Sequence, residues 1–241
     1  MLRKLILCAA LVATFNAVSA TPISYPNAAT TAENPMAQLP HNVIPQDYVV
    51  TITPDVDTMR IAGSETVNLF VSETTSSIQF NSSNQKLAHV LFDGATVQSV
   101  QSNEINQITT VKLKAPATIG KHTLSFSFVG QIGNQMHGIF TQPYTSHSGK
   151  PRLFLTAQFE GSDTHRIFPC WDNAAFNATY QLNVTVPKAW KAWSSIPVTQ
   201  SEAQGEYTTI SYQKTSDIKS ELFEFSNVHK LQVPENYIGK N

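Results

Sequence analysis

Short runs of alternating apolar and polar residues recur along the chain from Tyr48 onward. In the run at 124–129, Leu-Ser-Phe-Ser-Phe-Val, every second side chain is apolar until the last residue, so an extended backbone places these side chains on one face. Such runs, separated by turn residues, are typical of antiparallel sandwiches. The pattern predicts an all-β, antiparallel β-sandwich with strands at 48–53, 65–71, 77–80, 109–113, 124–129, 152–160, 178–186, 206–213 and 221–225.

Helical patterns are rare in this sequence. No segment combines ten or more residues of helical periodicity with capping residues. We expect at most a short helical turn within 171–176.

Residues 1–20 have the pattern of a secretory signal peptide. Arg3 and Lys4 supply a positive start, an apolar run follows at 5–15, and small residues suit cleavage after Ala20. The run is shorter than the roughly 20 apolar residues that cross a bilayer, although a buried N-terminal helix or an uncleaved anchor also fits it. We expect export to the periplasm or the outside, a flexible leader at 21–38 and a β domain at 39–241.

Composition excludes several classes of partner. Charged residues make up 14 % of the chain, against roughly 25 % in average soluble domains, and uncharged polar residues take their place. The formal net charge is -1, and no run of Lys and Arg is long enough to follow a phosphate backbone. We therefore expect no nucleic-acid partner, and no membrane span once the signal is removed.

Cys170 is the one thiol that remains after removal of the predicted signal. It cannot form an internal disulfide, which leaves two interpretations, a buried core residue or a reactive nucleophile. Its apolar neighbours Phe168, Pro169 and Trp171 favour a buried thiol with a structural role.

The stretch 155–180 carries the most specific pattern in the chain. Gln-Phe-Glu at 158–160 precedes Phe-Pro-Cys-Trp-Asp at 168–172, and Ala-Thr-Tyr follows at 178–180. Pro-Gln-Asp-Tyr stands upstream, at 45–48. In order and spacing these motifs resemble the N-terminal domain of the aminopeptidase N family of zinc metallopeptidases, and the resemblance covers about residues 38–230.

This resemblance implies a sandwich-like, saddle-shaped β domain that docks beside a thermolysin-like catalytic domain. It implies that Glu160 binds the free α-amino group of a peptide and that Gln158 helps to hold the first residue. The chemistry is reasonable on its own, because a buried ammonium group needs a carboxylate to compensate its charge. The alternative is that both side chains are ordinary solvent-facing strand residues.

The sequence departs from the family pattern near this block. His165 stands where the family carries Arg, although Arg166 follows directly, and Asn-Ala at 173–174 replaces the family's Glu-Pro. The second change removes a candidate ion pair at the seam between domains. Gln158 and Glu160 are both retained.

The zinc-binding motif of the family, His-Glu-x-x-His, is absent from this sequence, and no two of its seven His residues are four positions apart. We therefore assign no catalytic residue and no metal ligand, and we expect zinc only in a separate catalytic domain or chain. Peptide hydrolysis by this chain alone is not expected. The alternative function is a free-standing, non-enzymatic β-sandwich module that binds peptide, glycan or protein.

Two further patterns remain open. Glycosylation sequons begin at Asn81, Asn177 and Asn183, a motif that arises often by chance in a chain rich in Asn, Ser and Thr. Trp190 and Trp193 are close enough in sequence to form a binding patch, but ordinary packing at a sheet edge is favoured.

Overall fold

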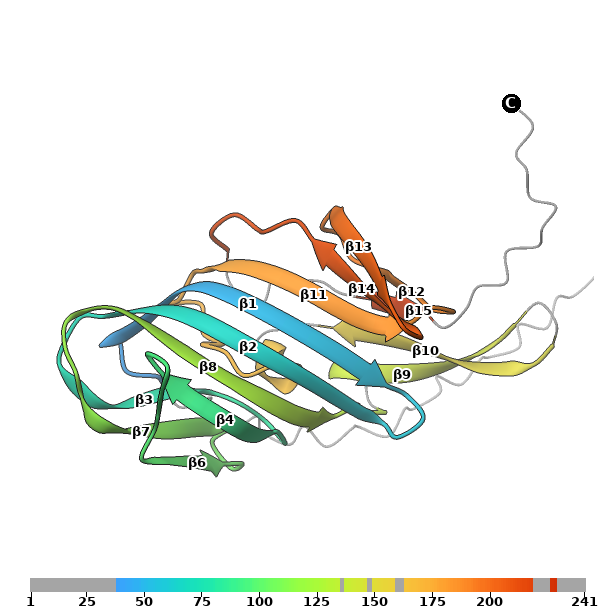
Figure 1. Cartoon of the computed structure of the whole chain (residues 1–241). Helices are drawn as coiled ribbons and strands as arrows, with labels where there is room; N and C mark the ends of the chain where they lie inside the picture. Colours follow the sequence, from blue (N-terminus) through green and yellow to red (C-terminus); the bar gives the residue numbers. More distant parts are fainter. Residues whose placement is uncertain (1–37, 135–136, 147–148, 159–162, 219–225, 229–241) are drawn as a thin grey trace, which may run out of the picture. The chain divides into compact units, whose positions relative to one another are not determined.

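A computed structural model describes residues 38–134, 137–146, 149–158, 163–218 and 226–228 (Figure 1). The predicted signal peptide and all but the last residue of the predicted leader lie outside these ranges. The boundaries proposed for both, at residues 20 and 38, stay predictions.

Fifteen strands and one 3₁₀ helix make up the described part of the chain. The largest sheet has eight strands in the order β13-β14-β11-β1-β2-β8-β4-β5 (Figure 1). Only the β1–β11 pair in it is parallel; the other neighbouring strands run antiparallel. In chain order the strands of this sheet are β1 (Val43–Asp55), β2 (Arg60–Val71), β4 (Lys86–Phe92), β5 (Ala95–Thr96), β8 (Gly120–Gln131), β11 (Thr179–Pro187), β13 (Val198–Gln204) and β14 (Tyr207–Tyr212).

Two smaller sheets complete the fold. A three-stranded sheet has the order β3-β7-β6, and a four-stranded sheet has the order β12-β15-β10-β9. The first is formed by β3 (Thr75–Asn81), β6 (Ser99–Asn103) and β7 (Ile108–Ala117). The second is formed by β9 (Gly138–Thr145), β10 (Pro151–Gln158), β12 (Lys191–Trp193) and β15 (Ser226–Val228). The predicted all-β, mainly antiparallel class is confirmed.

The core lies on the inner face of the eight-stranded sheet. Along β8, Leu124, Phe126 and Phe128 are buried, as their alternation predicts. The three-stranded sheet packs against this face, where Phe80 of β3 stacks on Phe126 at a centroid distance of 5.6 Å. Trp171 also packs against Phe80, at a centroid distance of 5.5 Å.

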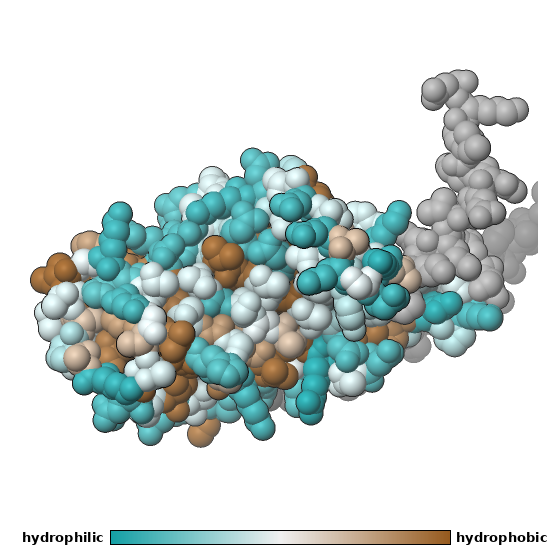
Figure 2. All heavy atoms as spheres, in the orientation of Figure 1, coloured by the Kyte–Doolittle hydropathy of each residue, from teal (hydrophilic) through white to brown (hydrophobic). Residues whose placement is uncertain are grey.

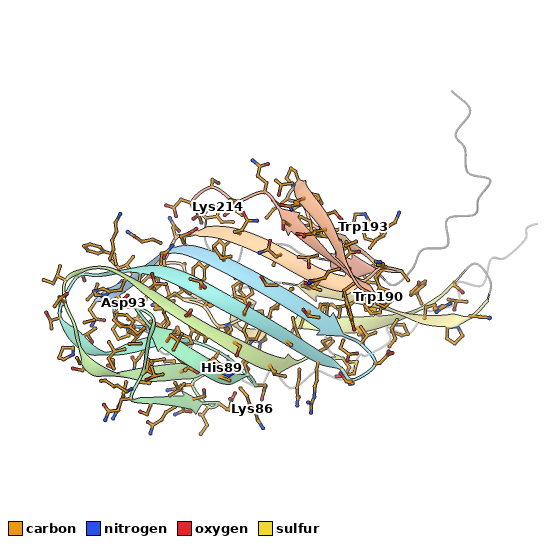
Figure 3. All side chains as sticks on the ribbon, viewed as in Figure 1. Lys86, His89, Asp93, Trp190, Trp193 and Lys214 are labelled. Atoms are coloured by element: carbon orange, nitrogen blue, oxygen red, sulfur yellow. The ribbon has the colours of Figure 1, made fainter. Side chains whose placement is uncertain are left out.

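The outer face of the eight-stranded sheet is polar. Figure 2 shows it as mostly hydrophilic and neutral residues, with hydrophobic ones scattered among them. Asp47 accepts hydrogen bonds from Lys214, Thr179 and Asn68 at 2.5, 2.6 and 3.2 Å, and Thr123 donates to Asn68 at 3.2 Å. Lys214 lies near one edge of this face (Figure 3). Cross-strand polar contacts thus replace apolar packing on this side.

The sequence did not predict the 3₁₀ helix η1, which spans Thr164–Arg166. The short turn expected within 171–176 is closed by a hydrogen bond from the Phe176 N–H to the Asn173 carbonyl. Several strands were also missed. β13 is exposed along its whole length and therefore has no apolar face that would predict a strand. β9 contains Pro143, and a proline argues against a strand in the sequence. The strand predicted at 221–225 lies outside the described residues.

Burial decides between the interpretations left open for the glycosylation sequons and for the tryptophan pair. Asn81 is buried, so its sequon is closed to modification in the folded chain, whereas Asn177 is exposed and Asn183 is half-buried. Trp190 packs partly against the core and Trp193 is exposed (Figure 3). Edge packing therefore accounts for Trp190.

One carboxyl group lies in the core without a partner. Glu65 of β2 is 2 % exposed, and neither of its carboxyl oxygens has a hydrogen-bond partner among the described residues. Burial raises the pKa of Glu65 well above its usual range. The folded state therefore holds a proton on Glu65 at pH values where the unfolded chain has lost it.

Glu65→Gln should make stability less dependent on pH. Below about pH 4.5, the ordinary value for this group, both states hold the proton; above it, stability falls by up to about 1.4 kcal/mol per pH unit until the folded carboxyl ionises. The variant should therefore be more stable than the wild type at pH 7, with the difference shrinking toward pH 4. Urea unfolding of both proteins across this range measures it. Glu73→Gln, at an exposed position, is the control, and a difference that stays constant with pH would contradict the account.

Candidate functional site

The predicted amine-binding segment begins where β10 ends. Gln158 is the last residue of β10, and its backbone lies opposite Gly138, the first residue of β9. Glu160 lies outside the described residues. The amine-binding roles of Gln158 and Glu160 therefore remain predictions, and the described surroundings of the segment are what the structure adds.

The chain that follows Glu160 in the sequence is held in place by a buried carboxylate, that of Asp163. Asp163 is 8 % exposed, and it accepts a hydrogen bond from Arg166 Nε at 2.6 Å. His137 Nδ1 lies 3.2 Å from its second oxygen. We call His137, Asp163 and Arg166 the Asp163 cluster. It connects the start of η1 to the residue that precedes β9.

Gly138 allows this close approach. Its φ is +63°, a left-handed value that favours glycine, and a Cβ built there would lie 2.7 Å from the Arg166 Cβ. Both ends of the segment that carries Glu160 are thus held against the same strand. Gln158 is held through the β9–β10 ladder, and Asp163 is held through Arg166 and His137.

A second buried carboxylate organises the Phe-Pro-Cys-Trp-Asp motif. Asp172 accepts hydrogen bonds from the His165 backbone N–H at 3.1 Å and from its Nδ1 at 2.6 Å. The other ring nitrogen of His165 lies 2.8 Å from Gln107 Oε1. The Asp172 backbone N–H donates to Asn81 Oδ1 at 3.1 Å. We call these four residues the Asp172 network.

His165, which stands where the family carries Arg, is therefore a structural residue. It is 1 % exposed, with both ring nitrogens facing oxygen atoms. A buried carboxylate is costly unless it is hydrogen-bonded, and His165 supplies two of the bonds that Asp172 accepts. Its side chain joins η1 to Gln107, which lies next to β7.

Cys170 and Trp171 anchor the same motif to two sheets. Cys170 exchanges backbone hydrogen bonds with Asn81 at 2.8 and 3.0 Å, and Trp171 N–H donates to the Tyr48 hydroxyl at 3.1 Å. Tyr48 in turn stacks on Tyr180 at a centroid distance of 4.6 Å. Burial raises the pKa of the Cys170 thiol well above its usual range, in agreement with the structural role expected for it.

Sequence reasoning missed most of these partners. Asn81 and Gln107 are 91 and 58 positions away from their partners in the network, Asp172 and His165 respectively. No local pattern connects positions so far apart. The ion pair between Asp163 and Arg166 could have been predicted from the sequence, because the two residues are three positions apart beside the motif.

The side chains of the described residues do not form a zinc site of the kind that the aminopeptidase N family carries. Within them, no group of three or more His, Cys, Asp or Glu side chains is placed to hold a metal ion. The same ranges hold no helix that is both long and apolar enough to cross a bilayer.

Comparison with known proteins identifies the family. The family model of the Peptidase M1 N-terminal domain matches residues 44–222. This chain belongs to that family. The M1 N-terminal domain matched here contains Gln158, Glu160, the Asp163 cluster and the Asp172 network, and the resemblance inferred from the motifs is confirmed.

Several curated relatives are aminopeptidases. Aminopeptidase N of Acetobacter pasteurianus is 36 % identical over 168 residues, which cover 70 % of this chain and 47 % of the relative. Aminopeptidase M1-B of Oryza sativa subsp. japonica is 30 % identical over 186 residues, covering 74 % and 21 %. Aminopeptidase M1 of Arabidopsis thaliana is 26 % identical, with the same coverage. The matches thus span about half of the first relative and about a fifth of the plant ones.

Gly138→Ala should cost more stability than Gly149→Ala. Both glycines have positive φ, +63° and +75°, so alanine is strained at each by about 1–2 kcal/mol. Only at Gly138 does the new Cβ also meet another residue, Arg166, because the space around Gly149 is open. Urea unfolding of the two variants compares these costs directly. Equal losses would mean that β9 and η1 are not in contact in the way described.

Proposed function

We propose that this chain is the exported domain that recognises peptide amino termini in a zinc aminopeptidase-like protein. Glu160 binds the protonated α-amino group, and Gln158 orients the first residue of the peptide. Hydrolysis needs zinc ligands that this sequence lacks, so a separate catalytic domain or chain is the expected partner. The observation that carries the proposal is the family match, which includes the Gln-Phe-Glu segment at 158–160.

The surroundings of the segment support this role. A carboxylate distinguishes a free amine from a blocked one only if it is held where solvent does not outcompete it. The described residues on either side of it, Gln158 and Asp163, are held by the β9–β10 ladder and by Arg166. Asp163 already pairs with Arg166, so this cation has an acceptor other than Glu160.

Export is proposed from the N-terminal sequence alone. Arg3, Lys4, the apolar run at 5–15 and the small residues before Thr21 support it. The one cysteine that remains after removal of the predicted signal, Cys170, has a free thiol, so the fold does not depend on the redox state of the compartment.

A peptide with a free amino terminus should bind the purified chain more tightly than its acetylated form. A charge-assisted hydrogen bond contributes about 1.5–3 kcal/mol, which corresponds to roughly a tenfold or greater preference. Calorimetric or NMR titration with trialanine amide and N-acetyl-trialanine amide, near pH 7, measures this ratio.

Glu160→Gln should bring that ratio close to one, while Gln142→Ala, an exposed amide on β9, should leave it unchanged. Circular dichroism shows whether each variant is folded. Equal binding of the two peptides by the wild type, or a ratio that survives Glu160→Gln, would contradict the proposed role.

A further inference from the structure

The three-stranded sheet carries a polar cleft that shares no residue with the site described above. Its volume is about 730 Å³, within the range of small-ligand sites. One wall is a row across the sheet, in which Thr110 of β7 is paired with Gln79 of β3 and with Gln101 of β6. The other wall is the connection between β6 and β7, which includes Ile105 and Asn106.

The lining residues hold their positions through local hydrogen bonds. Gln79 Nε2 donates to Thr110 Oγ1 at 3.2 Å, which orients this amide along the row. Asn103 Oδ1 accepts from the backbone N–H groups of Ile105 and Asn106 at 3.0 and 3.4 Å. These bonds shape the tip of the β6–β7 hairpin before any ligand arrives.

Two amides in the cleft have groups available to a ligand. The hydrogen bond to Thr110 uses only the nitrogen of the Gln79 amide, so the Gln79 oxygen can accept from a ligand. Gln101 is exposed on the edge strand β6, and its amide makes no hydrogen bond to the described part of the chain. Each carboxamide offers both a donor and an acceptor.

The charge of the lining restricts the class of ligand. None of the described residues that line the cleft is Lys or Arg, so phosphate groups and nucleic acids find no counter-charge there. The one carboxylate is Glu104, and one of its oxygens already accepts the Asn84 N–H at 2.8 Å. The cleft therefore suits an uncharged ligand with many hydrogen-bonding groups.

We propose that this cleft binds a neutral oligosaccharide. A sugar hydroxyl is donor and acceptor at once, so neighbouring hydroxyls match the amides of Gln79 and Gln101. Ile105, which is 82 % exposed, supplies apolar contact for a sugar ring. An extended peptide along β6 fits less well, because it needs pockets for alternate side chains, and the cleft is lined with amides and hydroxyls.

The test is titration of the purified chain with a panel of neutral hexasaccharides, cellohexaose, maltohexaose, xylohexaose and chitohexaose, followed by NMR or calorimetry. At least one should bind at millimolar concentration or below. Gln101→Ala should weaken that binding by roughly two- to tenfold, the loss expected for one or two hydrogen bonds, and Gln79→Ala with Gln101→Ala should abolish it.

The matched control is Gln200→Ala, which removes an exposed amide from another edge strand, β13, and should leave sugar binding unchanged. Glu160→Gln should also leave it unchanged, so failure here is separate from failure of the proposed peptide role. The proposal is overturned if no hexasaccharide binds, if the double variant binds as the wild type does, or if polygalacturonate or a peptide displaces the sugar from the cleft.

Discussion

The carboxylate of Asp172 is buried at the point where the three-stranded sheet, the eight-stranded sheet and η1 meet. A charge in such a place destabilises the fold unless hydrogen bonds compensate it. The backbone and ring of His165 supply these bonds, and the chain on either side is fixed as a consequence. Cys170 pairs with Asn81 of β3, and Trp171 reaches Tyr48 of β1. Three consecutive residues therefore join two sheets between which the described part of the chain has no strand pairing.

The functional consequence lies a few residues upstream. His165 belongs to η1, so the Asp172 network fixes this helix. Asp163, the residue before η1, pairs with Arg166 and lies close to His137. The segment that carries Glu160 thus ends on a part of the chain anchored to the core. A carboxylate that recognises an amine benefits from such anchoring, because binding then loses less conformational freedom.

The sequence predicted the parts of the fold that depend on one strand and one face. The alternation in β8 located its buried residues, and the alternation near Tyr48 located β1. It failed for β13, which has no buried face, and for η1, whose three residues are fixed by partners rather than by helical propensity. The family motif indicated where chemistry was to be expected, but not which of its residues are structural. Asp172 and Cys170 proved to be structural through contacts with Asn81, 91 and 89 positions away.

Hydrogen–deuterium exchange of Asp172→Asn against the wild type tests this account most directly. Asparagine keeps the shape of the side chain but loses the charge that His165 compensates, so exchange should become faster in 163–170 and at the start of β9. The central strands β1, β2 and β8 should keep their protection, because their ladders do not include Asp172. Unchanged exchange in 163–170, or an increase spread equally over β1, β2 and β8, would contradict the claim that the Asp172 network anchors residues 163–170 to the core.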